Sequence, residues 1–361
     1  MFYNYHCDIL FQVPRRTTSI VLQCVYIFES WVEAVFIGVY MAIFLVGVAG
    51  NLLVIGVILG NKHMWTTINL FLLNLAASDI IMSVFASSKF LDRWRFLGEE
   101  EAMCKLTTTS MTVSVNMSTF TLAAIAINRY RAVFYPFRIS TQNSSLTRTV
   151  AIILTIDLMA ILITLPKTVD AEFIPNHYQQ KLVCMIPWPL LPYRVYWWLI
   201  HIAQFVIPFT IIIISYVSIM IRLRQRARNQ PESRTEIQIQ EEDARTARVN
   251  KMLMAMVFIF GICWFPQNLI QHLSDIDKVF CWELYFLSLY IAHVIAMSST
   301  CYNPFLYGWM NPAFKTEFAR LCSRFLNIAT AKQDSHNSVN DVSEEVVIES
   351  IGEIEDGSKR R

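Results

Sequence analysis

The stretch AVFIGVYMAIFLVGVAGNLLVIGVIL, residues 34–59, decides the fold class of this chain. It contains no charged side chain, and Asn51 is its only amide. A helix needs about 20 mostly apolar residues to cross the roughly 30 Å hydrocarbon layer of a bilayer. Because lipid offers no hydrogen-bond partner to the backbone, a spanning run of this length must be helical. The stretch therefore predicts a transmembrane helix.

Six further apolar runs of similar length follow along the chain. Together with the first, they cover approximately residues 34–59, 68–90, 103–133, 149–166, 195–223, 249–273 and 284–310. We therefore predict an all-α membrane protein, built as a seven-transmembrane helix bundle. Beyond the last span, in residues 311–327, apolar side chains recur at helical spacing with basic residues between them. This pattern predicts a short amphipathic helix on the inner membrane surface.

The composition also indicates that lipid is part of the solvent. Of the 361 residues, 55% are hydrophobic and only 16% are charged, whereas soluble domains carry about 25% charged residues. The net charge of +2 gives no reason to expect a nucleic-acid partner. The sequence shows no paired nucleophile and base, metal-ligand cluster or phosphate-binding loop, so we expect neither an enzyme nor a bound cofactor.

Basic residues indicate how the chain is oriented. Lysine and arginine gather in the links after spans one, three and five, most densely between Arg222 and Lys251. By the positive-inside rule these links are cytoplasmic, so the N-terminus lies outside the plasma membrane. We expect an extracellular tail over residues 1–33, without the order of a cleaved signal, and a membrane domain over residues 34–310. A disordered cytoplasmic tail is expected over residues 328–361.

Polar side chains inside the spans indicate a structural or functional role, because burying them in lipid costs free energy. Asp79 lies in the second span, and two other spans offer oxygen atoms: Ser118 in the third, and Ser299 and Asn303 in the seventh. Such oxygens suit a small hard cation such as sodium, or a network of water molecules. The alternative is a protonated Asp79 in a helix interface. Asp157, in the fourth span, has no evident partner in the sequence.

Short motifs occur in a defined order along the spans. They are GNLLV at 50–54, NLAASD at 74–79, Cys104, NRY at 128–130, Pro208 with Tyr216, CWFP at 263–266 and NPFLY at 303–307. This set resembles the rhodopsin-like (class A) G-protein-coupled receptors over about residues 34–325. The resemblance implies a non-enzymatic transducer that activates a heterotrimeric G protein and binds arrestin.

Other residues narrow the resemblance within this family. Met111 stands where aminergic receptors have an Asp, and Met297 stands where opsins have the retinal-binding lysine. Four further features resemble the neuropeptide Y, neuropeptide F and RFamide receptor group. They are AQFVIPF at 203–209, CWFPQN at 263–268, His293 with AMSS at 296–299, and GWMNPAFK at 308–315. This resemblance implies an amidated RFamide-like or neuropeptide F-like ligand and a Gi/o partner. The alternatives are a receptor for another peptide, such as a tachykinin-like one, or, remotely, a seven-helix transporter, whose internal repeats we do not find.

The resemblance also implies roles for individual residues. The ligand site it implies comprises Asp275, Gln204, Gln271, His293, Met111 and Trp264. Asp275 is expected to meet an arginine of the peptide. The residues implied in activation and G-protein coupling are Asn128, Arg129, Tyr130, Tyr216, Phe260, Pro266, Asn303, Pro304 and Tyr307. The implied sodium site comprises Asp79, Ser118, Ser299 and Asn303.

The cysteines are interpreted by position. Cys104 and Cys184 both fall on the extracellular side, where disulfides persist, and the family pattern pairs them. Cys7, Cys24 and Cys281 lie on the same side, and the pairing of a second bridge among them stays open. Cys322 follows the seventh span, where palmitoylation and a plain thiol facing lipid are the two alternatives.

Three positions depart from the family pattern. Asn128 replaces the acidic residue that usually precedes Arg129, so the ion pair that favours the resting state is missing and we expect raised basal signalling. The fourth span lacks the usual Trp, at about Ile156 or Asp157. Met111 stands where relatives often have Gln, so recognition of an amidated peptide end is expected to be rearranged.

Overall fold

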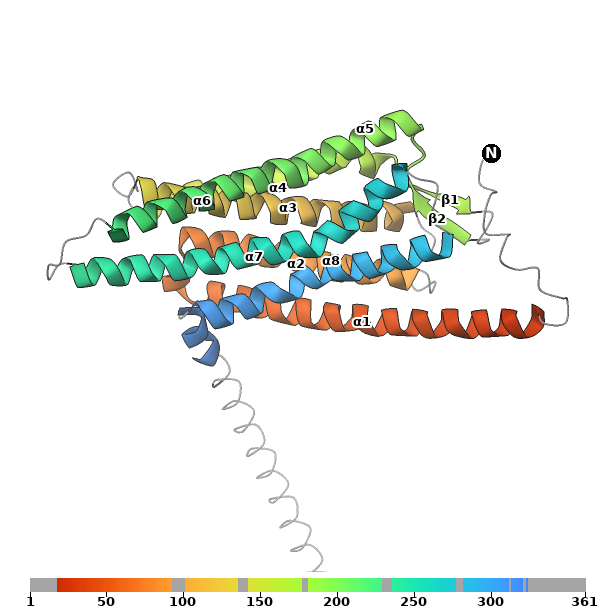
Figure 1. Cartoon of the computed structure of the whole chain (residues 1–361), viewed down its shortest axis with the longest axis horizontal. Helices are drawn as coiled ribbons and strands as arrows, with labels where there is room; N and C mark the ends of the chain where they lie inside the picture. Colours follow the sequence, from red (N-terminus) through yellow and green to blue (C-terminus); the bar gives the residue numbers. More distant parts are fainter. Residues whose placement is uncertain are drawn as a thin grey trace, which may run out of the picture. The chain divides into compact units, whose positions relative to one another are not determined.

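The computed structural model describes residues 18–92, 101–135, 142–176, 181–228, 236–276, 282–311, 313–320 and 323. Its long helices are α1 (Thr18–Gly60), α2 (Thr67–Asp92), α3 (Glu101–Phe134), α4 (Gln142–Val169), α5 (Leu190–His201), α6 (Ile207–Arg228), α7 (Glu236–Ile276) and α8 (Trp282–Met310). A 3-10 turn, η1 (Lys62–Met64), joins α1 to α2, and a π-helical turn, η3 (Ile202–Val206), joins α5 to α6. Figure 1 shows these helices running along one common direction.

The predicted seven-helix bundle is confirmed. Because α5, η3 and α6 follow one another without a break, they form a single span. The segments long and apolar enough to cross a membrane are Ala34–Gly60, Thr67–Phe85, Cys104–Phe134, Leu146–Val169, Leu191–Arg226 and Thr246–His272. The seventh span is α8, an apolar helix that also contains the polar residues Ser299, Thr300 and Asn303.

Two helices extend beyond the apolar runs. α1 begins at Thr18, inside the segment that the sequence assigns to the N-terminal tail, and α7 begins at Glu236, inside the basic link before the sixth span. Hydropathy marks only the part of a helix that lies in lipid. Once a helix is nucleated, each further residue adds a hydrogen bond, so the helix continues past the apolar boundary.

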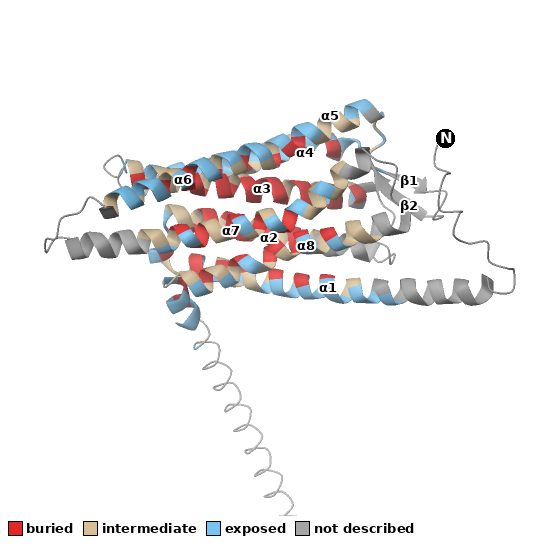
Figure 2. Cartoon of the chain, in the orientation of Figure 1, coloured by how far each residue is buried: buried red, intermediate tan, exposed pale blue. Residues whose placement is uncertain are grey.

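α3 is the central helix of the bundle. It packs against α2, α4 and α6, and its apolar stretch is 78% buried, whereas that of the peripheral α4 is 22% buried. Figure 2 shows α3 as mostly buried and the outer flank of α1 as largely exposed. Hydroxyl groups on α3 bond their own backbone: Thr112 donates to the carbonyl of Thr108 at 3.2 Å. Such back-bonding makes a polar central helix tolerable in an apolar bundle.

Small residues let α1 approach its neighbours closely. A Cβ added at Gly50 would lie 2.9 Å from Cγ of Pro304 on α8, and one added at Gly47 would collide with Oγ of Ser83 on α2. Asn51 donates through Nδ2 to the carbonyls of Gly47, at 2.9 Å, and Thr300, at 3.0 Å. Close contact combined with interhelical hydrogen bonds is how helices associate in lipid, where apolar burial gives no driving force.

A β-hairpin lies in the link between α4 and α5. Strands β1 (Glu172–Asn176) and β2 (Lys181–Met185) pair antiparallel, with Phe173 opposite Cys184. β1 packs against α3. From the sequence this segment is only a cysteine-bearing link, because five-residue strands leave a weak periodic signal. A two-stranded hairpin is marginal alone, so its contact with α3 contributes to its stability.

Residues from Asn311 onward form a separate unit. Residues 313–320 are helical, within the predicted amphipathic segment. Oδ1 of Asn311 accepts a hydrogen bond from the backbone N–H of Phe314 at 3.4 Å, as a helix-capping residue does. Glu317 and Arg320 form an ion pair one turn apart. Cys322 and residues 324–361 lie outside the described residues.

Candidate ligand and coupling sites

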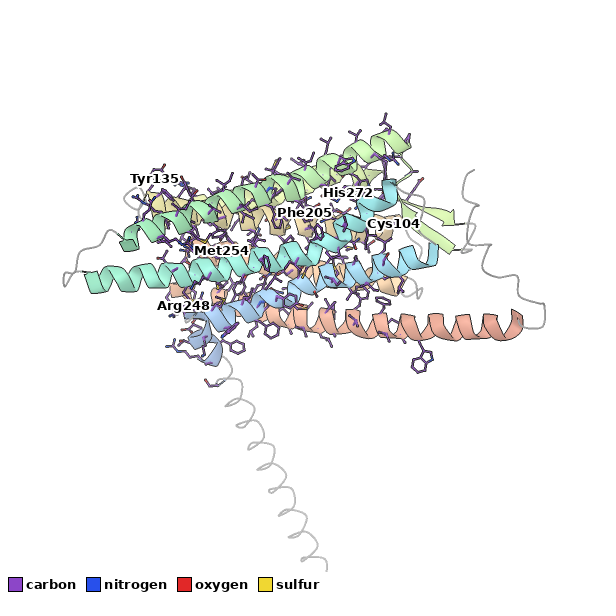
Figure 3. The ribbon with its side chains drawn as sticks, viewed as in Figure 1. Cys104, Tyr135, Phe205, Arg248, Met254 and His272 are labelled. Carbon is purple, nitrogen blue, oxygen red and sulfur yellow. The ribbon has the colours of Figure 1, made fainter. Side chains whose placement is uncertain are left out.

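The bundle has two distinct ends, which Figure 3 marks by labelled residues. We call the end with Cys104, His272 and the β1–β2 hairpin the hairpin end. The opposite end, with Tyr135 and Arg248, we call the coupling end.

An aromatic cluster joins the α5–α6 span to α7. We define it as Phe205, Phe209, Phe260 and Trp264. The ring centroids of Phe205 and Trp264 are 6.1 Å apart, and those of Phe260 and Trp264 are 5.8 Å apart. Trp264 is buried, and its indole Nε1 has no acceptor among the described residues. Trp264 lies two residues before Pro266, inside α7, where the hydrogen bond that proline cannot donate allows a bend.

The π-helical turn η3 places Gln204 in the interior. A π turn adds one residue to the helical repeat, and Gln204, inside this turn, is only 6% exposed. Sequence periodicity cannot show this inserted residue. Gln204, which the resemblance assigns to the ligand site, therefore faces the packed inside of the bundle.

His201 is a functional candidate that sequence reasoning missed. Nδ1 of His201 bonds the carbonyl of Trp197 at 2.8 Å, and Nε2 lies 3.0 Å from Oδ1 of Asn268 on α7. Its ring also contacts the ring of His272, with centroids 4.3 Å apart. The signal was present, since Asn268 ends the quoted CWFPQN motif. These contacts link α5 directly to the half of α7 beyond Pro266.

The other implied ligand residues lie on three helices. Met111, on α3, is 9% exposed, and Gln271, on α7, is half-buried. The hydroxyl of Tyr40 and Nδ1 of His293 are hydrogen-bonded at 2.5 Å, which ties α8 to α1. Asp275 lies in α7, one turn after His272, but its side chain is outside the described residues.

Cys104 is disulfide-bonded and fully buried at the start of α3. Cys184 lies on β2, opposite the strand that packs against α3, but its side chain is outside the described residues. Cys7 and Cys281 are also outside them, as is the side chain of Cys24. Among the described cysteines, Cys263 and Cys301 are free thiols.

Polar side chains meet at the centre of the bundle. Nδ2 of Asn303 donates to Oδ2 of Asp79 at 2.7 Å, and both residues are buried. Ser118 is hydrogen-bonded to Ser78 at 2.8 Å. Oγ of Ser299 is buried and has no hydrogen-bond partner among the described residues. The structure thus joins Asp79 to Asn303 directly, and it leaves the hydroxyl of Ser299 available on the same helix as Asn303.

Asp157 has the partner that the sequence did not reveal. Nδ2 of Asn74 donates to Oδ1 of Asp157 at 3.1 Å and also to Oγ1 of Thr121 at 3.1 Å. The three residues come from α4, α2 and α3. A carboxyl group therefore connects α4 to the bundle at the place where the family usually has the indole of Trp.

The coupling end contains the residues expected to act in signalling. Nε of Arg129 and the hydroxyl of Tyr216 are buried without hydrogen-bond partners among the described residues. Tyr307 is fully buried. Arg226 of α6 donates to the carbonyl of Val133 near the end of α3 at 2.9 Å, and the guanidinium of Arg222 lies 5.9 Å from the ring of Phe134. Contacts between α6 and α3 thus exist beside Asn128, where the usual carboxylate is absent.

Comparison with known proteins identifies the class. A model of the seven-transmembrane receptors of the rhodopsin family matches residues 50–307. The chain belongs to this family, and it is a multi-pass membrane receptor of the G-protein-coupled class. Members of the family are receptors and not enzymes, which agrees with the expectation from the sequence.

Three relatives show where the chain falls within the family. It is 31% identical to neuropeptide FF receptor 1 of Rattus norvegicus over 84% of this chain and 75% of the relative. It is 32% identical to the RYamide receptor of Drosophila melanogaster, over 79% of this chain and 62% of the relative. It is 30% identical to the neuropeptide F receptor of Drosophila melanogaster, over 80% of this chain and 62% of the relative.

Proposed function

We propose that this chain is a plasma-membrane receptor for an amidated RFamide-like neuropeptide and that it activates a heterotrimeric G protein of the Gi/o class. The observation that carries the proposal is its similarity, over most of its length, to receptors named for neuropeptide FF, RYamide and neuropeptide F. The hairpin end is then extracellular and the coupling end cytoplasmic, in agreement with the basic links.

The ligand site lies between α3, η3, α7 and α8 at the hairpin end. Trp264 forms its floor, Gln204 and Gln271 supply hydrogen bonds, and Met111 offers an apolar wall where no amide is present. Asp275 meets the arginine of the peptide. It follows His272 by one helical turn, and the ring of His272 stacks on Trp198 with centroids 4.4 Å apart, so this turn of α7 packs against α5.

Sodium is the proposed allosteric ion. Its site is formed by Asp79, Ser118, Ser299 and Asn303, which supply carboxylate, hydroxyl and amide oxygens of the type that hard cations prefer. The buried hydroxyl of Ser299, with no protein partner among the described residues, supports this donor set. A bound cation would neutralise the Asp79 carboxylate, whose burial as a charge is costly.

Signalling needs no covalent chemistry in this chain. When α7 swings about Pro266, the coupling end opens, and the exposed cleft receives a helix of the G protein. Arg129, Tyr130, Tyr216 and Tyr307 line that cleft. Arrestin is the second cytoplasmic partner, and palmitate on Cys322 anchors the segment after the last span.

A nucleotide-exchange assay on membranes from cells expressing the receptor tests this function. The probes are amidated peptides ending in Arg-Phe-amide or Arg-Tyr-amide, each with its free-acid counterpart. We expect at least one amidated peptide to raise exchange on Gi/o, with the free acid at least tenfold less potent. A receptor at the cell surface that responds to none of the amidated peptides would refute the proposal.

Asp275→Asn tests the contact with the peptide's arginine, and Glu172→Gln, an exposed carboxylate on β1, is the matched control. A charge-assisted hydrogen bond in a partly closed site is worth about 1.5–3 kcal/mol, so potency should fall by about 10-fold to 100-fold. Equal potency of Asp275→Asn and wild type, at equal surface expression, would exclude the contact.

A further inference from the structure

His201 and His272 bring two imidazole rings together between α5 and α7, near the hairpin end (Figure 3). Their ring centroids lie 4.3 Å apart. His201 is buried, whereas His272 is partly exposed and stacks on Trp198. Asn268 precedes His272 by four residues on α7, so the two side chains lie on one face of that helix. Three side chains that carry nitrogen or oxygen therefore meet at a place that solvent reaches through His272.

The hydrogen bonds of His201 leave the lone pair of its Nε2 for a ligand. Nδ1 lies 2.8 Å from the carbonyl of Trp197, which can only accept, so Nδ1 carries the proton. In the neutral ring Nε2 is then unprotonated, and it lies 3.0 Å from Oδ1 of Asn268, which also has lone pairs. Two acceptors at this distance need a cation between them, unless the amide turns over and donates an N–H to Nε2. A bond from Nδ1–H to a backbone carbonyl is also what orients metal-binding histidines.

The spacing of these groups suits a tetrahedral zinc ion. Zn²⁺ takes nitrogen and oxygen ligands at about 2.0–2.2 Å, which places two ligand atoms about 3.3 Å apart. Nε2 of His201 and Oδ1 of Asn268 are close to this separation. Two imidazoles on one such ion have centroids about 5 Å apart, so the rings of His201 and His272 separate by about 1 Å as the ion binds.

His272 can make this adjustment without losing a hydrogen bond. Its contacts are with the rings of Trp198 and His201, and neither of its nitrogens has a hydrogen-bond partner among the described residues. With His201 and Asn268 it provides three protein ligands, and water fills the fourth position, as in other zinc sites with three protein ligands.

We propose that His201, His272 and Asn268 form a Zn²⁺ site, and that zinc bound there lowers the affinity of the receptor for its peptide. The effect on affinity rests on the proposed function, whereas the site itself does not. Asp275, proposed above to meet the arginine of the peptide, follows His272 by one helical turn. A dication at His272 repels that arginine. It also ties α5 to α7 beyond Pro266.

Zinc binding is measured first, on purified full-length receptor without peptide. Zn²⁺ is titrated against a fluorescent chelator, and Mg²⁺ and Ca²⁺, which prefer oxygen ligands, are the control ions. We expect the affinity for zinc to fall at least about tenfold in His201→Gln and in His272→Gln. His63→Gln, which removes an exposed histidine of η1, should leave it unchanged.

Asn268→Asp provides a gain of binding that a misfolded variant cannot imitate. It replaces the amide oxygen by a carboxylate, which is a common zinc ligand and whose charge attracts the dication. We expect this variant to bind zinc at least about tenfold more tightly than wild type, or about 1.4 kcal/mol. Adding His201→Gln to it should remove the gain.

Peptide potency in nucleotide exchange is then compared with and without Zn²⁺ within each variant. Zinc should lower the potency of the peptide at least about threefold in wild type and in His63→Gln, about 0.65 kcal/mol. It should leave potency unchanged in His201→Gln and His272→Gln. The comparison within a variant separates the effect of zinc from any direct effect of the substitution on the peptide.

The two parts of the inference can fail separately. A wild-type receptor that binds no zinc, or histidine variants that bind it as tightly as wild type, would overturn the site. Zinc that binds through both histidines and leaves peptide potency unchanged would overturn its effect on the peptide. A receptor that responds to no peptide contradicts the proposed function, while the titration on purified receptor still decides the zinc site.

Discussion

The side-chain amide of Asn74, on α2, connects two neighbouring helices. Its NH₂ group serves two acceptors, Thr121 on α3 and Asp157 on α4, each at 3.1 Å. The apolar stretch of α4 is only 22% buried, and the helix packs against α3 and α2. Hydrogen bonds to charged groups contribute more than bonds between neutral groups. The Asn74–Asp157 bond therefore adds to the attachment of α4 to its neighbours.

Asp157→Ala should lower the stability of the receptor. The substitution leaves one N–H of Asn74 without its acceptor, which costs about 1–3 kcal/mol, and we expect a lower melting temperature for the purified receptor in detergent. Thr155→Ala is the control, because Thr155 is exposed on the same helix and, among the described residues, bonds the backbone of its own helix at Ala151. Equal melting temperatures for Asp157→Ala and wild type would show that the bond is not stabilising.

Asp79 offers a test of the proposed sodium site. If sodium binds the resting bundle, peptide affinity should fall as sodium rises, because the ion stabilises the state that binds peptide less well. Asp79→Asn removes the charge and should abolish this dependence. Binding is measured at constant ionic strength, with N-methylglucamine replacing sodium, so that general screening is held fixed. A dependence that persists in Asp79→Asn would remove the support for the site.

Asn128 is expected to raise the basal activity of the receptor. A neutral amide beside Arg129 cannot form an ion pair, and Nε of Arg129 is buried without a partner among the described residues. Asn128→Asp would supply the missing carboxylate, and charge-assisted bonds are stronger than neutral ones. We expect nucleotide exchange without peptide to fall at least about threefold, about 0.65 kcal/mol. Asn128→Gln should leave it unchanged, and an unaltered basal rate in Asn128→Asp would contradict this explanation.

At the scale of elements, α3 and the α5–α6 span are joined differently at their two ends. Near the hairpin end, α3 meets the π-helical turn η3, and at the coupling end Arg226 bonds the carbonyl of Val133. A cation at the C-terminus of a helix is favoured by the partial negative charge of its last carbonyls. Arg226 therefore holds α6 to α3 at the end where the resting ion pair is absent.

Arg226→Met should raise basal activity, because it removes this link while keeping a long apolar stem. Because the closed state loses the hydrogen bond between α6 and α3, the open state becomes more populated in the absence of peptide. We expect at least a twofold rise in peptide-independent nucleotide exchange at equal surface expression. Arg224→Met, which removes an exposed arginine of the same helix, is the control, and a rise of the same size in that variant would attribute the effect to lost charge alone.

At the scale of the whole molecule, the sequence predicted the number and order of spans because hydropathy over about 20 residues is a strong signal. It did not predict where α1 and α7 begin, since helices continue beyond the lipid. Short motifs identified Asp79 and Asn303, and Nδ2 of Asn303 lies 2.7 Å from Oδ2 of Asp79. The contacts of Asp157, His201 and His272 escaped notice because they depend on which helices become neighbours, and no local pattern encodes that.

Cys104, at the start of α3, is disulfide-bonded. We propose Cys184 on β2 as its partner, which would fasten the hairpin across the mouth of the ligand site. Closing so long a loop constrains the unfolded chain and stabilises the folded one by about 2–4 kcal/mol. Cys104 is fully buried, and the hairpin that it would hold packs against α3 through β1.

Cys104→Ser should therefore abolish the peptide response and reduce delivery to the cell surface, and Cys184→Ser should reproduce both effects. Surface labelling measures delivery, and nucleotide exchange measures response. Cys301→Ser is the control, because Cys301 is a free, half-buried thiol of α8 whose loss breaks no cross-link. Because each variant replaces one cysteine sulfur by an oxygen, the difference between Cys104→Ser and Cys301→Ser isolates the effect of the cross-link. Normal delivery and response in Cys104→Ser would show that the mouth of the site needs no covalent restraint, and an effect of Cys104→Ser that Cys184→Ser lacks would exclude the pairing.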